Sequence, residues 1–276
     1  MVRLLFVSTY ELGRQPFGLA SPAAWLRAAG HQIQCVDLAC GSLPEDAVRA
    51  AGLVAFYLPM HTATRLAVRA IERVRALNPS AHLCCYGLYA SLNEGYLRRL
   101  GVKTILGGEY EPELVALAGR VSDTGQATPE TIVSLDRLRF LPPDRAGLPP
   151  LSQYAALRVN GERRLVGYTE ASRGCKHLCR HCPVAPVYNG AFRIVQPDVV
   201  LEDIRRQVAM GAEHITFGDP DFFNGPAHAV RIVKAVHQEF PSLTYDVTIK
   251  IEHLLRRRDL LSVLHRTGCL FVTSAA

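Results

Sequence analysis

Three cysteines stand close together in the stretch GCKHLCRHCP at residues 174–183. Cys175, Cys179 and Cys182 have the spacing C-x3-C-x2-C, and the chain of 276 residues has only eight cysteines in all. Thiolates this close in sequence can ligate a metal ion or an iron–sulfur cluster. They can also form one face of a buried helix, so three interpretations have to be weighed.

The first interpretation is a buried helix face. Together with Leu178, the three cysteines fall at helical spacing. Gly174 and Pro183 bracket the stretch, however, and the remaining positions are lysine, arginine and histidine. A structural helix is therefore disfavoured.

The second interpretation is a structural zinc site. The three thiolates with His177 or His181 would complete a closed tetrahedral site. Structural zinc sites usually pair two cysteine knuckles, whereas the rest of the C-terminal part offers only the lone Cys269. This alternative is weaker, but it stays open.

The third interpretation is an iron–sulfur cluster, and it fits the stretch best. Cysteine thiolates are the usual ligands of a [4Fe-4S] cluster, and three cysteines leave the fourth iron without a protein ligand. An open coordination position is typical of a reactive metal centre. The stretch also follows a strand expected at 165–171, and parallel α/β sheets bind ligands at the carboxyl ends of their strands.

The segment SRGCKHLCRHC resembles the cysteine motif of the radical SAM (S-adenosylmethionine) superfamily. The resemblance implies that Cys175, Cys179 and Cys182 ligate a [4Fe-4S] cluster whose open iron binds SAM. It also implies that one-electron reduction cleaves SAM to a 5′-deoxyadenosyl radical, which acts on a substrate that is a small molecule or is of unknown class. A reductant such as flavodoxin or ferredoxin would supply the electron. His181 stands where the superfamily often has Phe, Tyr or Trp, and its ring is expected to lie against adenine.

The resemblance assigns a second group of residues to SAM. In this superfamily, the second barrel strand ends in a polar motif whose backbone receives the SAM amino group. Gly218, Asp219, Pro220 and Asp221 occupy that place here. Glycine, aspartate and proline also favour turns, so an ordinary turn is the alternative.

Two further pairs are expected near SAM. Lys250 and Glu252 stand near the end of the third expected strand, where a spacing of two places them on one face. Thr273 and Ser274 end the fourth strand, where the superfamily often has a polar residue near the ribose. The alternatives are a solvated strand end for the first pair and a frayed terminus for the second.

Short apolar runs alternate with helical patterns through residues 1–120. Strands are expected at 4–8, 31–38, 53–59, 82–88 and 103–108, and helices at 21–30, 63–79 and 111–119. This alternation predicts a doubly wound parallel sheet, that is, a Rossmann-like domain. Residues 121–163 hold two Pro-Pro pairs and little periodicity, which predicts a proline-rich linker.

Alternation resumes over residues 164–276. Strands are expected at 165–171, 214–223, 244–252 and 269–274, with helices at 197–211, 226–240 and 253–267. A closed eight-unit barrel needs about 250 residues, so these elements predict an incomplete radical SAM (β/α) barrel of about four strands. We therefore expect a fragment, a truncated coding sequence or a chain that completes its sheet with a partner, and it could be inactive alone.

The order of Rossmann-like domain, proline-rich linker and cysteine motif resembles the radical SAM branch that carries a cobalamin-binding domain. That resemblance implies cobalamin as a further cofactor, with methyl transfer or ring rearrangement as the reaction. The branch often has a cobalt-ligating histidine after its first strand, but the loop STYELGRQPFG has none. His61 is interpreted as a cap or surface residue, whereas Gly107, Gly108 and Glu109 resemble the family's glycine-rich turn.

Charge and hydropathy indicate which partners and which cellular location to expect. The net charge is +6, and the densest basic run, Arg256–Arg258, lies in an amphipathic pattern without aromatic residues, so nucleic acid is not expected as a partner. No apolar run approaches the ~20 residues that span a bilayer, and the N-terminus does not have the pattern of a signal peptide. A cytoplasmic protein is expected. A non-catalytic iron–sulfur or zinc-binding sensor or scaffold remains the alternative to a radical SAM enzyme.

Overall fold

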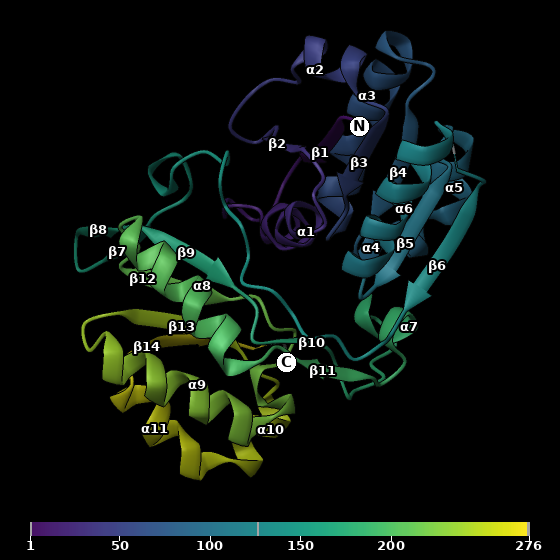
Figure 1. Cartoon of the computed structure of the whole chain (residues 1–276). Helices are drawn as coiled ribbons and strands as arrows, with labels where there is room; N and C mark the ends of the chain where they lie inside the picture. The colour runs from purple at the N-terminus through teal and green to yellow at the C-terminus, as the bar shows by residue number, and fades with distance from the viewer. Residues whose placement is uncertain (1, 126, 275–276) are drawn as a thin grey trace. The chain divides into compact units, whose positions relative to one another are not determined.

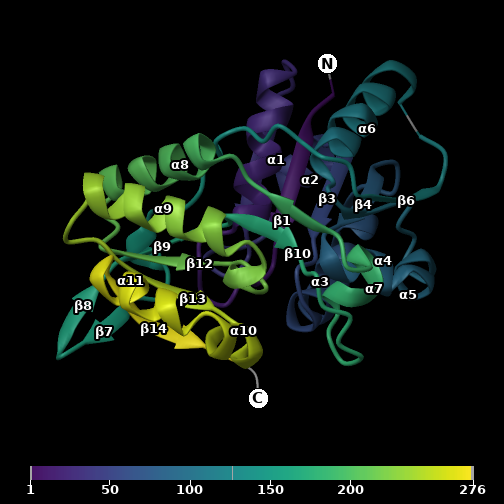
Figure 2. The ribbon, with the colours of Figure 1, turned by 90° about the horizontal axis from the view of Figure 1, so that it is seen from below.

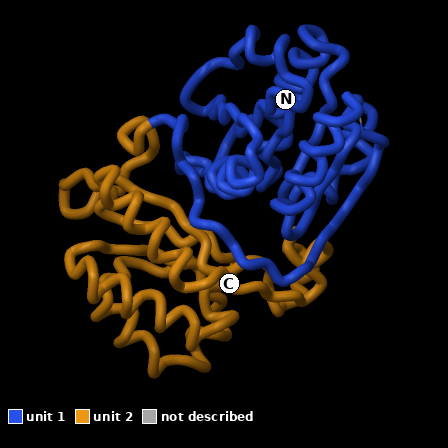
Figure 3. Tube along the Cα trace, in the orientation of Figure 1, with its two compact units in different colours: residues 1–149 blue, residues 150–276 orange. Residues whose placement is uncertain are grey.

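The computed structural model describes residues 2–125 and 127–274, which belong to two compact units, Met1–Pro149 and Pro150–Ala276 (Figure 3). The sequence places a linker at 121–163, whereas the first unit continues to Pro149. The additional residues contribute a strand and a segment that packs on the first unit. No helix among the described residues is long and apolar enough to cross a membrane.

The first unit is built on a six-stranded parallel sheet in the order β2-β1-β3-β4-β5-β6 (Figure 1). Its strands are β1 (Leu4–Ser8), β2 (Ile33–Asp37), β3 (Leu53–Tyr57), β4 (His82–Tyr86), β5 (Thr104–Gly108) and β6 (Glu130–Ser134). Every residue of β1, β3, β4 and β5 is buried, as expected for strands covered on both faces. The five strands expected in this unit are confirmed to within two residues at each end.

Helices cover both faces of this sheet. The first face carries α1 (Phe17–Ala28) and α6 (Glu111–Thr124), and the second carries α2 (Glu45–Ala50), α3 (His61–Leu77), α4 (Leu88–Leu92) and α5 (Glu94–Arg99). The strand order with helices on both sides is that of a doubly wound fold. The predicted Rossmann-like architecture of the N-terminal part is therefore confirmed.

Helix α1 begins four residues earlier than the sequence predicts, and it contains a proline. Pro22 has no N–H for the carbonyl of Gly18, which would accept its bond in a regular helix. The hydroxyl of Tyr86 donates to that carbonyl at 2.7 Å instead. A donor from β4 thus replaces the missing helical bond, and the helix continues through Pro22.

Strand β6 lies within the segment predicted as a linker. It pairs in parallel with β5 and is only half-buried, since it is the last strand of the sheet. Gly108 has φ +68°, and a Cβ there would lie 2.0 Å from the carbonyl oxygen of Ser134. Further on, Arg27 forms an ion pair with Asp144 at 2.6 Å, so the proline-rich residues pack against α1.

The second unit contains a four-stranded parallel sheet of β9 (Val166–Thr169), β12 (His214–Phe217), β13 (Thr244–Thr248) and β14 (Cys269–Thr273). Each strand pairs with the next one along the chain, as in a (β/α) barrel. Helices α8 (Pro197–Ala209) and α9 (Pro226–Glu239) lie side by side on one face (Figures 1 and 2). The predicted partial barrel of about four strands is confirmed.

The shorter elements of this unit precede β9 or connect the barrel strands. They are η1 (Leu151–Gln153), the hairpin β7 (Leu157–Val159) and β8 (Glu162–Arg164), the ribbon β10 (Ser172–Gly174) and β11 (Phe192–Ile194), α7 (Val184–Tyr188), η2 (Phe222–Asn224), α10 (Ile251–Arg256), η3 (Arg258–Leu260) and α11 (Leu261–Arg266). The single helix expected at 253–267 is thus divided into α10, η3 and α11.

The strand expected at 244–252 is too long and requires a correction. Strand β13 ends at Thr248, and its neighbour β14 ends at Thr273, with which Thr248 pairs. Among the described residues, β14 does not continue beside β13 past this point, and the chain turns into α10. Lys250 precedes that helix and Glu252 lies in its first turn, so they do not share a strand face.

Candidate functional site

The three clustered cysteines lie in one loop, residues 175–191, which the antiparallel β10–β11 ribbon closes. The ribbon pairs Gly174 with Phe192 at the mouth of the loop. Cys175 is buried, while Cys179 and Cys182 are half-buried, and all three are free thiols. No helix is formed between them, which excludes the buried helix face. The loop thus carries three thiols without a disulfide.

Gly174 is required at the start of this loop. Its φ is +70°, a conformation that residues with a Cβ rarely adopt. A Cβ at this position would lie 2.3 Å from the carbonyl oxygen of Ala191 on the other side of the ribbon. The glycine therefore allows the two ends of the cysteine loop to approach each other.

Asn224 connects the cysteine loop to the turn after β12. Its Nδ2 donates to Sγ of Cys175 at 3.4 Å, and its Oδ1 accepts from the backbone N–H of Lys176 at 3.2 Å. The Lys176 ammonium donates to the Asn224 carbonyl at 2.7 Å. Asn224 is buried and was not among the predicted site residues. The one signal for it in the sequence is a polar residue directly after Phe222 and Phe223.

The predicted SAM motif at 218–221 follows β12 as expected, and its members have different surroundings. Pro220 is exposed, whereas Asp219 is buried. The Asp219 carboxylate accepts from the backbone N–H of Ala171 at 2.9 Å and from the hydroxyl of Ser172. Burial raises the pKa of Asp219 to about 7, although these hydrogen bonds lower it. Asp219 thus fixes the backbone that leads into the ribbon.

Gly218 packs directly against β9. A Cβ at this position would lie 1.9 Å from the hydroxyl oxygen of Tyr168, and its own N–H donates to the Thr169 carbonyl at 2.8 Å. A side chain here would require Tyr168 to move, because the backbone of this turn lies close to the end of β9. The structure places this backbone next to the start of the cysteine loop.

Five polar side chains from three loops meet beside the cysteines. His253 Nδ1 lies 2.8 Å from Asp221 Oδ2, and His253 Nε2 lies 3.1 Å from His177 Nε2. On the far side of the His177 ring, Nδ1 lies 3.2 Å from Lys250 Nζ, which donates to Glu252 Oε2 at 2.9 Å. The structure therefore brings Asp221, Lys250 and Glu252 together, as the sequence predicts, and adds His177 and His253.

Charge and burial shift the pKa values of His177 and Lys250 in this group. Burial, followed by the positive charges of Lys250 and His253, lowers the pKa of His177. The hydrogen bond from Lys250 to Glu252 raises the pKa of the lysine, and a negative charge at Cys179 acts in the same direction. Lys250 therefore provides a positive charge beside the cysteine loop.

The remaining predicted residues lie at more open positions. His181 is exposed in the cysteine loop, and Thr273 is exposed at the end of β14, beside the half-buried Ser274. In the first unit, His61 is exposed at the start of α3, in agreement with its interpretation as a surface residue.

The first unit has its own candidate binding edge. Polar residues gather at the carboxyl ends of its strands, where doubly wound sheets bind ligands. The buried members of this group are Ser8, Thr9, Glu11, Asp37 and Glu109. The predicted glycine-rich turn ends β5 at this same edge and leads into α6, and the loop after β1 contains no histidine.

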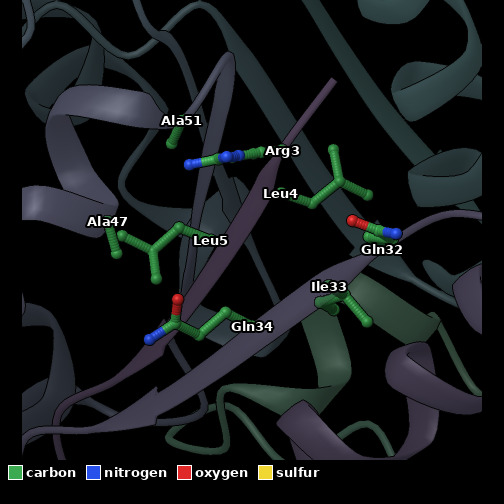
Figure 4. Close-up of a pocket in the computed structure, with 8 residues that line it drawn as sticks. All are labelled: Arg3, Leu4, Leu5, Gln32, Ile33, Gln34, Ala47 and Ala51. Carbon is green, nitrogen blue, oxygen red and sulfur yellow. The ribbon is translucent and has the colours of Figure 1, made fainter. Parts of the chain in front are cut away.

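A pocket of about 340 Å³ lies at the opposite end of the first sheet (Figure 4). It is lined by Arg3, Leu4, Leu5, Gln32, Ile33, Gln34, Ala47 and Ala51. These residues surround the amino ends of β1 and β2, far along the strands from the carboxyl edge. The pocket is therefore separate from the edge where this fold class binds its ligands.

Comparison with known proteins identifies the fold. No protein-family model and no curated protein matches the sequence. Two solved structures of the radical S-adenosylmethionine methyltransferase TsrM from Kitasatospora setae are similar to it. One, with tryptophan substrate and a SAM analogue (aza-SAM) bound, has a TM-score of 0.71 and 17% identity. The other, with cobalamin and a [4Fe-4S] cluster bound, has a TM-score of 0.70 and 16% identity.

The similarity extends over 100% of this chain and 59% of the TsrM chain. The chain therefore has the fold of the corresponding part of that methyltransferase. This agrees with the predicted architecture of a doubly wound domain followed by a partial (β/α) barrel.

Proposed function

We propose that the chain is a radical SAM iron–sulfur protein that binds a [4Fe-4S] cluster through Cys175, Cys179 and Cys182. The observation that carries this proposal is the loop itself, which holds three free thiols at the carboxyl end of β9 in a fold like that of TsrM. Thiolates are the usual ligands of such clusters, and three of them leave one iron open. The donor set therefore fits the cofactor.

The bound cluster would supply one electron to SAM and cleave it to methionine and a 5′-deoxyadenosyl radical. The chain's own residues would prepare this site. Asn224 donates a hydrogen bond to the Cys175 sulfur, and Lys250 provides positive charge near Cys179. The close-packed backbone at Gly218 would receive the SAM amino group, with Asp219 holding that turn against the ribbon.

We further propose that the first unit binds cobalamin at the carboxyl edge of its sheet, without a histidine ligand from the loop after β1. The buried polar groups at that edge and the doubly wound fold support a ligand there. With cobalamin and SAM together, methyl transfer to a small-molecule substrate is the reaction class that we favour. A flavodoxin or ferredoxin would act as the reductant, in the cytoplasm.

Anaerobic reconstitution with iron and sulfide tests the cluster. We expect a brown protein with broad visible absorbance and about four irons per chain. Replacing any one of Cys175, Cys179 and Cys182 with alanine should abolish the absorbance, whereas Cys269→Ala, in β14 of the same unit, should retain it. A colourless protein that carries stoichiometric zinc on the same three cysteines would overturn the proposal.

Products formed from SAM test the reaction. The reconstituted chain with dithionite and SAM should release 5′-deoxyadenosine, measured by liquid chromatography and mass spectrometry. Release of S-adenosylhomocysteine with a methylated cobalamin would instead indicate methyl transfer without reductive cleavage. A reduced cluster that leaves SAM intact would favour the non-catalytic sensor or scaffold.

A further inference from the structure

We propose that His177, Asp221 and His253 form a second metal site, for a divalent transition metal ion such as Zn²⁺, beside the cysteine loop. The site is separate from the three thiols and does not depend on SAM. Its ligands come from three different segments: the cysteine loop, the turn after β12 and helix α10.

The geometry is that of a site with three protein ligands. One candidate ligand atom from each residue lies within 4.8 Å of the other two. Asp221 Oδ2 is 2.8 Å from His253 Nδ1 and 3.9 Å from His177 Nε2. Ligands that bind one Zn²⁺ at about 2.0–2.2 Å lie roughly 3–3.5 Å from each other. Small side-chain rotations therefore bring all three atoms to one ion.

Asp221 supplies a second, independent observation. Its side chain is 3% exposed, and Oδ2 has no hydrogen-bond partner among the described residues. Nδ1 of His253 also lacks one, although the two atoms are 2.8 Å apart. A short contact without hydrogen-bond alignment is expected between two ligands of one ion. Without an ion, a buried carboxylate oxygen left in this way is unfavourable.

The other oxygen of the Asp221 carboxylate accepts a backbone hydrogen bond. Oδ1 accepts from the backbone N–H of Phe223 at 3.0 Å, which orients the carboxylate in its turn. Ligating carboxylates are commonly held by such a second hydrogen bond. The remaining oxygen, Oδ2, is thereby directed at the two imidazoles.

The chemistry of the donor set selects the metal class. Two imidazoles and one carboxylate suit zinc, iron or cobalt and leave coordination positions open. The set contains no thiolate, so the three cysteines remain available as ligands of the cluster. The ion would fix His177, and with it the cysteine loop, to the ends of β12 and β13.

A hydrogen-bonded chain without an ion is the competing explanation. In that chain Lys250 donates to His177 Nδ1, which leaves the proton on Nε2 and blocks metal binding there. In the metal site Nδ1 carries the proton, and Lys250 keeps only its bond to Glu252. Lys250→Met distinguishes the two, because it breaks the hydrogen-bonded chain and leaves the metal ligands in place.

The test measures zinc and iron on the same protein. Cluster-loaded chain is equilibrated with Zn²⁺, freed of unbound metal by gel filtration and analysed by mass spectrometry for both elements. We expect one zinc per chain in addition to the cluster iron. His253→Ala and Asp221→Asn should lose the zinc and keep the iron. Lys250→Met should retain the zinc, and the control His265→Ala, at an exposed histidine on α11, should retain both metals.

X-ray absorption at the zinc edge needs no variant and covers the case in which a variant fails to fold. Nitrogen and oxygen ligands at about 2.0–2.1 Å, with no sulfur near 2.3 Å, are expected. The proposal is overturned if the parent chain takes up no zinc beyond the cluster, if sulfur ligates it, or if Lys250→Met abolishes it. Equal loss of iron and zinc in folded His253→Ala would likewise overturn it.

Failure of the cluster would not obscure the result. If no cluster forms, the variant with Cys175, Cys179 and Cys182 all changed to serine is equilibrated with Zn²⁺ alone. Zinc bound to this variant supports the second site while the iron–sulfur proposal fails. A zinc-free variant together with a cluster-loaded parent that also lacks zinc rejects the second site and leaves the cluster proposal intact.

Discussion

The side-chain nitrogen of Asn224 lies 3.4 Å from the sulfur of Cys175, and both residues are buried. This contact joins the first cysteine of the loop to a turn 49 residues further along the chain. Hydrogen bonds to cluster sulfurs shift reduction potentials, and partners outside the ligand set affect metal affinity. If the loop holds a cluster as we propose, Asn224 is part of that site without being a ligand.

Asn224→Ala is expected to weaken the cluster. The change removes the donor to Cys175 and the acceptor for the Lys176 N–H. We expect iron affinity to fall by about 10–100-fold and the reduction potential to become more negative, measured by chelator competition and potentiometric EPR. Asn160→Gly, at an exposed residue with φ +51°, is the control and should match the parent. Unchanged affinity and potential would remove Asn224 from the site.

Gly218→Ala is expected to destabilise the second unit. The new methyl group would overlap Tyr168, and overpacking of this kind costs about 1–3 kcal/mol. Thermal unfolding followed by circular dichroism measures the effect. Gly119→Ala is the control, because the position is inside α6 and an added Cβ would meet nothing within 4 Å apart from its own chain neighbours and helix backbone. It should be neutral or stabilising by up to about 1 kcal/mol. Equal effects of both changes would contradict the packing argument.

Asp219 is expected to make the second unit less stable as the pH rises. Its pKa in the folded protein is about 7, against an ordinary value of 3.8, because the carboxyl group is buried. The folded state therefore holds a proton that the unfolded state releases, and stability falls between these values by at most roughly 1.4 kcal/mol per pH unit. Below the lower value the contribution is fully present, and it is lost as the pH passes the higher one.

Urea unfolding at about pH 5 and about pH 8 measures this contribution. Asp219→Asn, which cannot ionise, should show a smaller loss of stability between the two conditions than the parent chain. Asp198→Asn, at an exposed position in α8, should behave as the parent. A parent and an Asp219→Asn variant with the same pH dependence would show that Asp219 does not titrate in this range.

Tyr86→Phe is expected to destabilise the first unit. It removes the hydroxyl that bonds the Gly18 carbonyl, and an unsatisfied buried acceptor costs about 1–3 kcal/mol. The unfolding midpoint in urea should fall accordingly, while Tyr96→Phe, on the partly exposed Tyr96 of α5, should leave it unchanged. If both variants unfold at the parent's midpoint, Tyr86 does not support the proline inside α1.

Local patterns in the sequence were sufficient for much of the fold. The three cysteines are recognisable because their spacing lies within one loop, and the inner strands because burial on both faces makes them continuous apolar runs. Strand β6 was missed because an edge strand is only half-buried and its residues ETIVS stand in a proline-rich setting. Its pairing depends on Gly108, a residue of a different strand.

The site was only partly predictable for a related reason. His253 lies 76 residues from His177, in a stretch with the pattern of an amphipathic helix, and nothing local marks it as part of a site. Asn224 lies 49 residues from Cys175. Lys250 and Glu252 were placed together for a reason that the structure does not bear out, since β13 ends before them. Partners that meet only through tertiary structure leave no spacing to detect.

The β10–β11 ribbon has a consequence for the order of events during assembly. It brings together the two ends of a 17-residue loop, residues 175–191, by pairing Gly174 with Phe192. Closing a flexible loop of that length costs about 2.5 kcal/mol of chain entropy from its length dependence alone. In the folded chain, the pairing of the ribbon offsets that cost. A cluster bound as we propose would therefore enter a loop whose two ends are already held together.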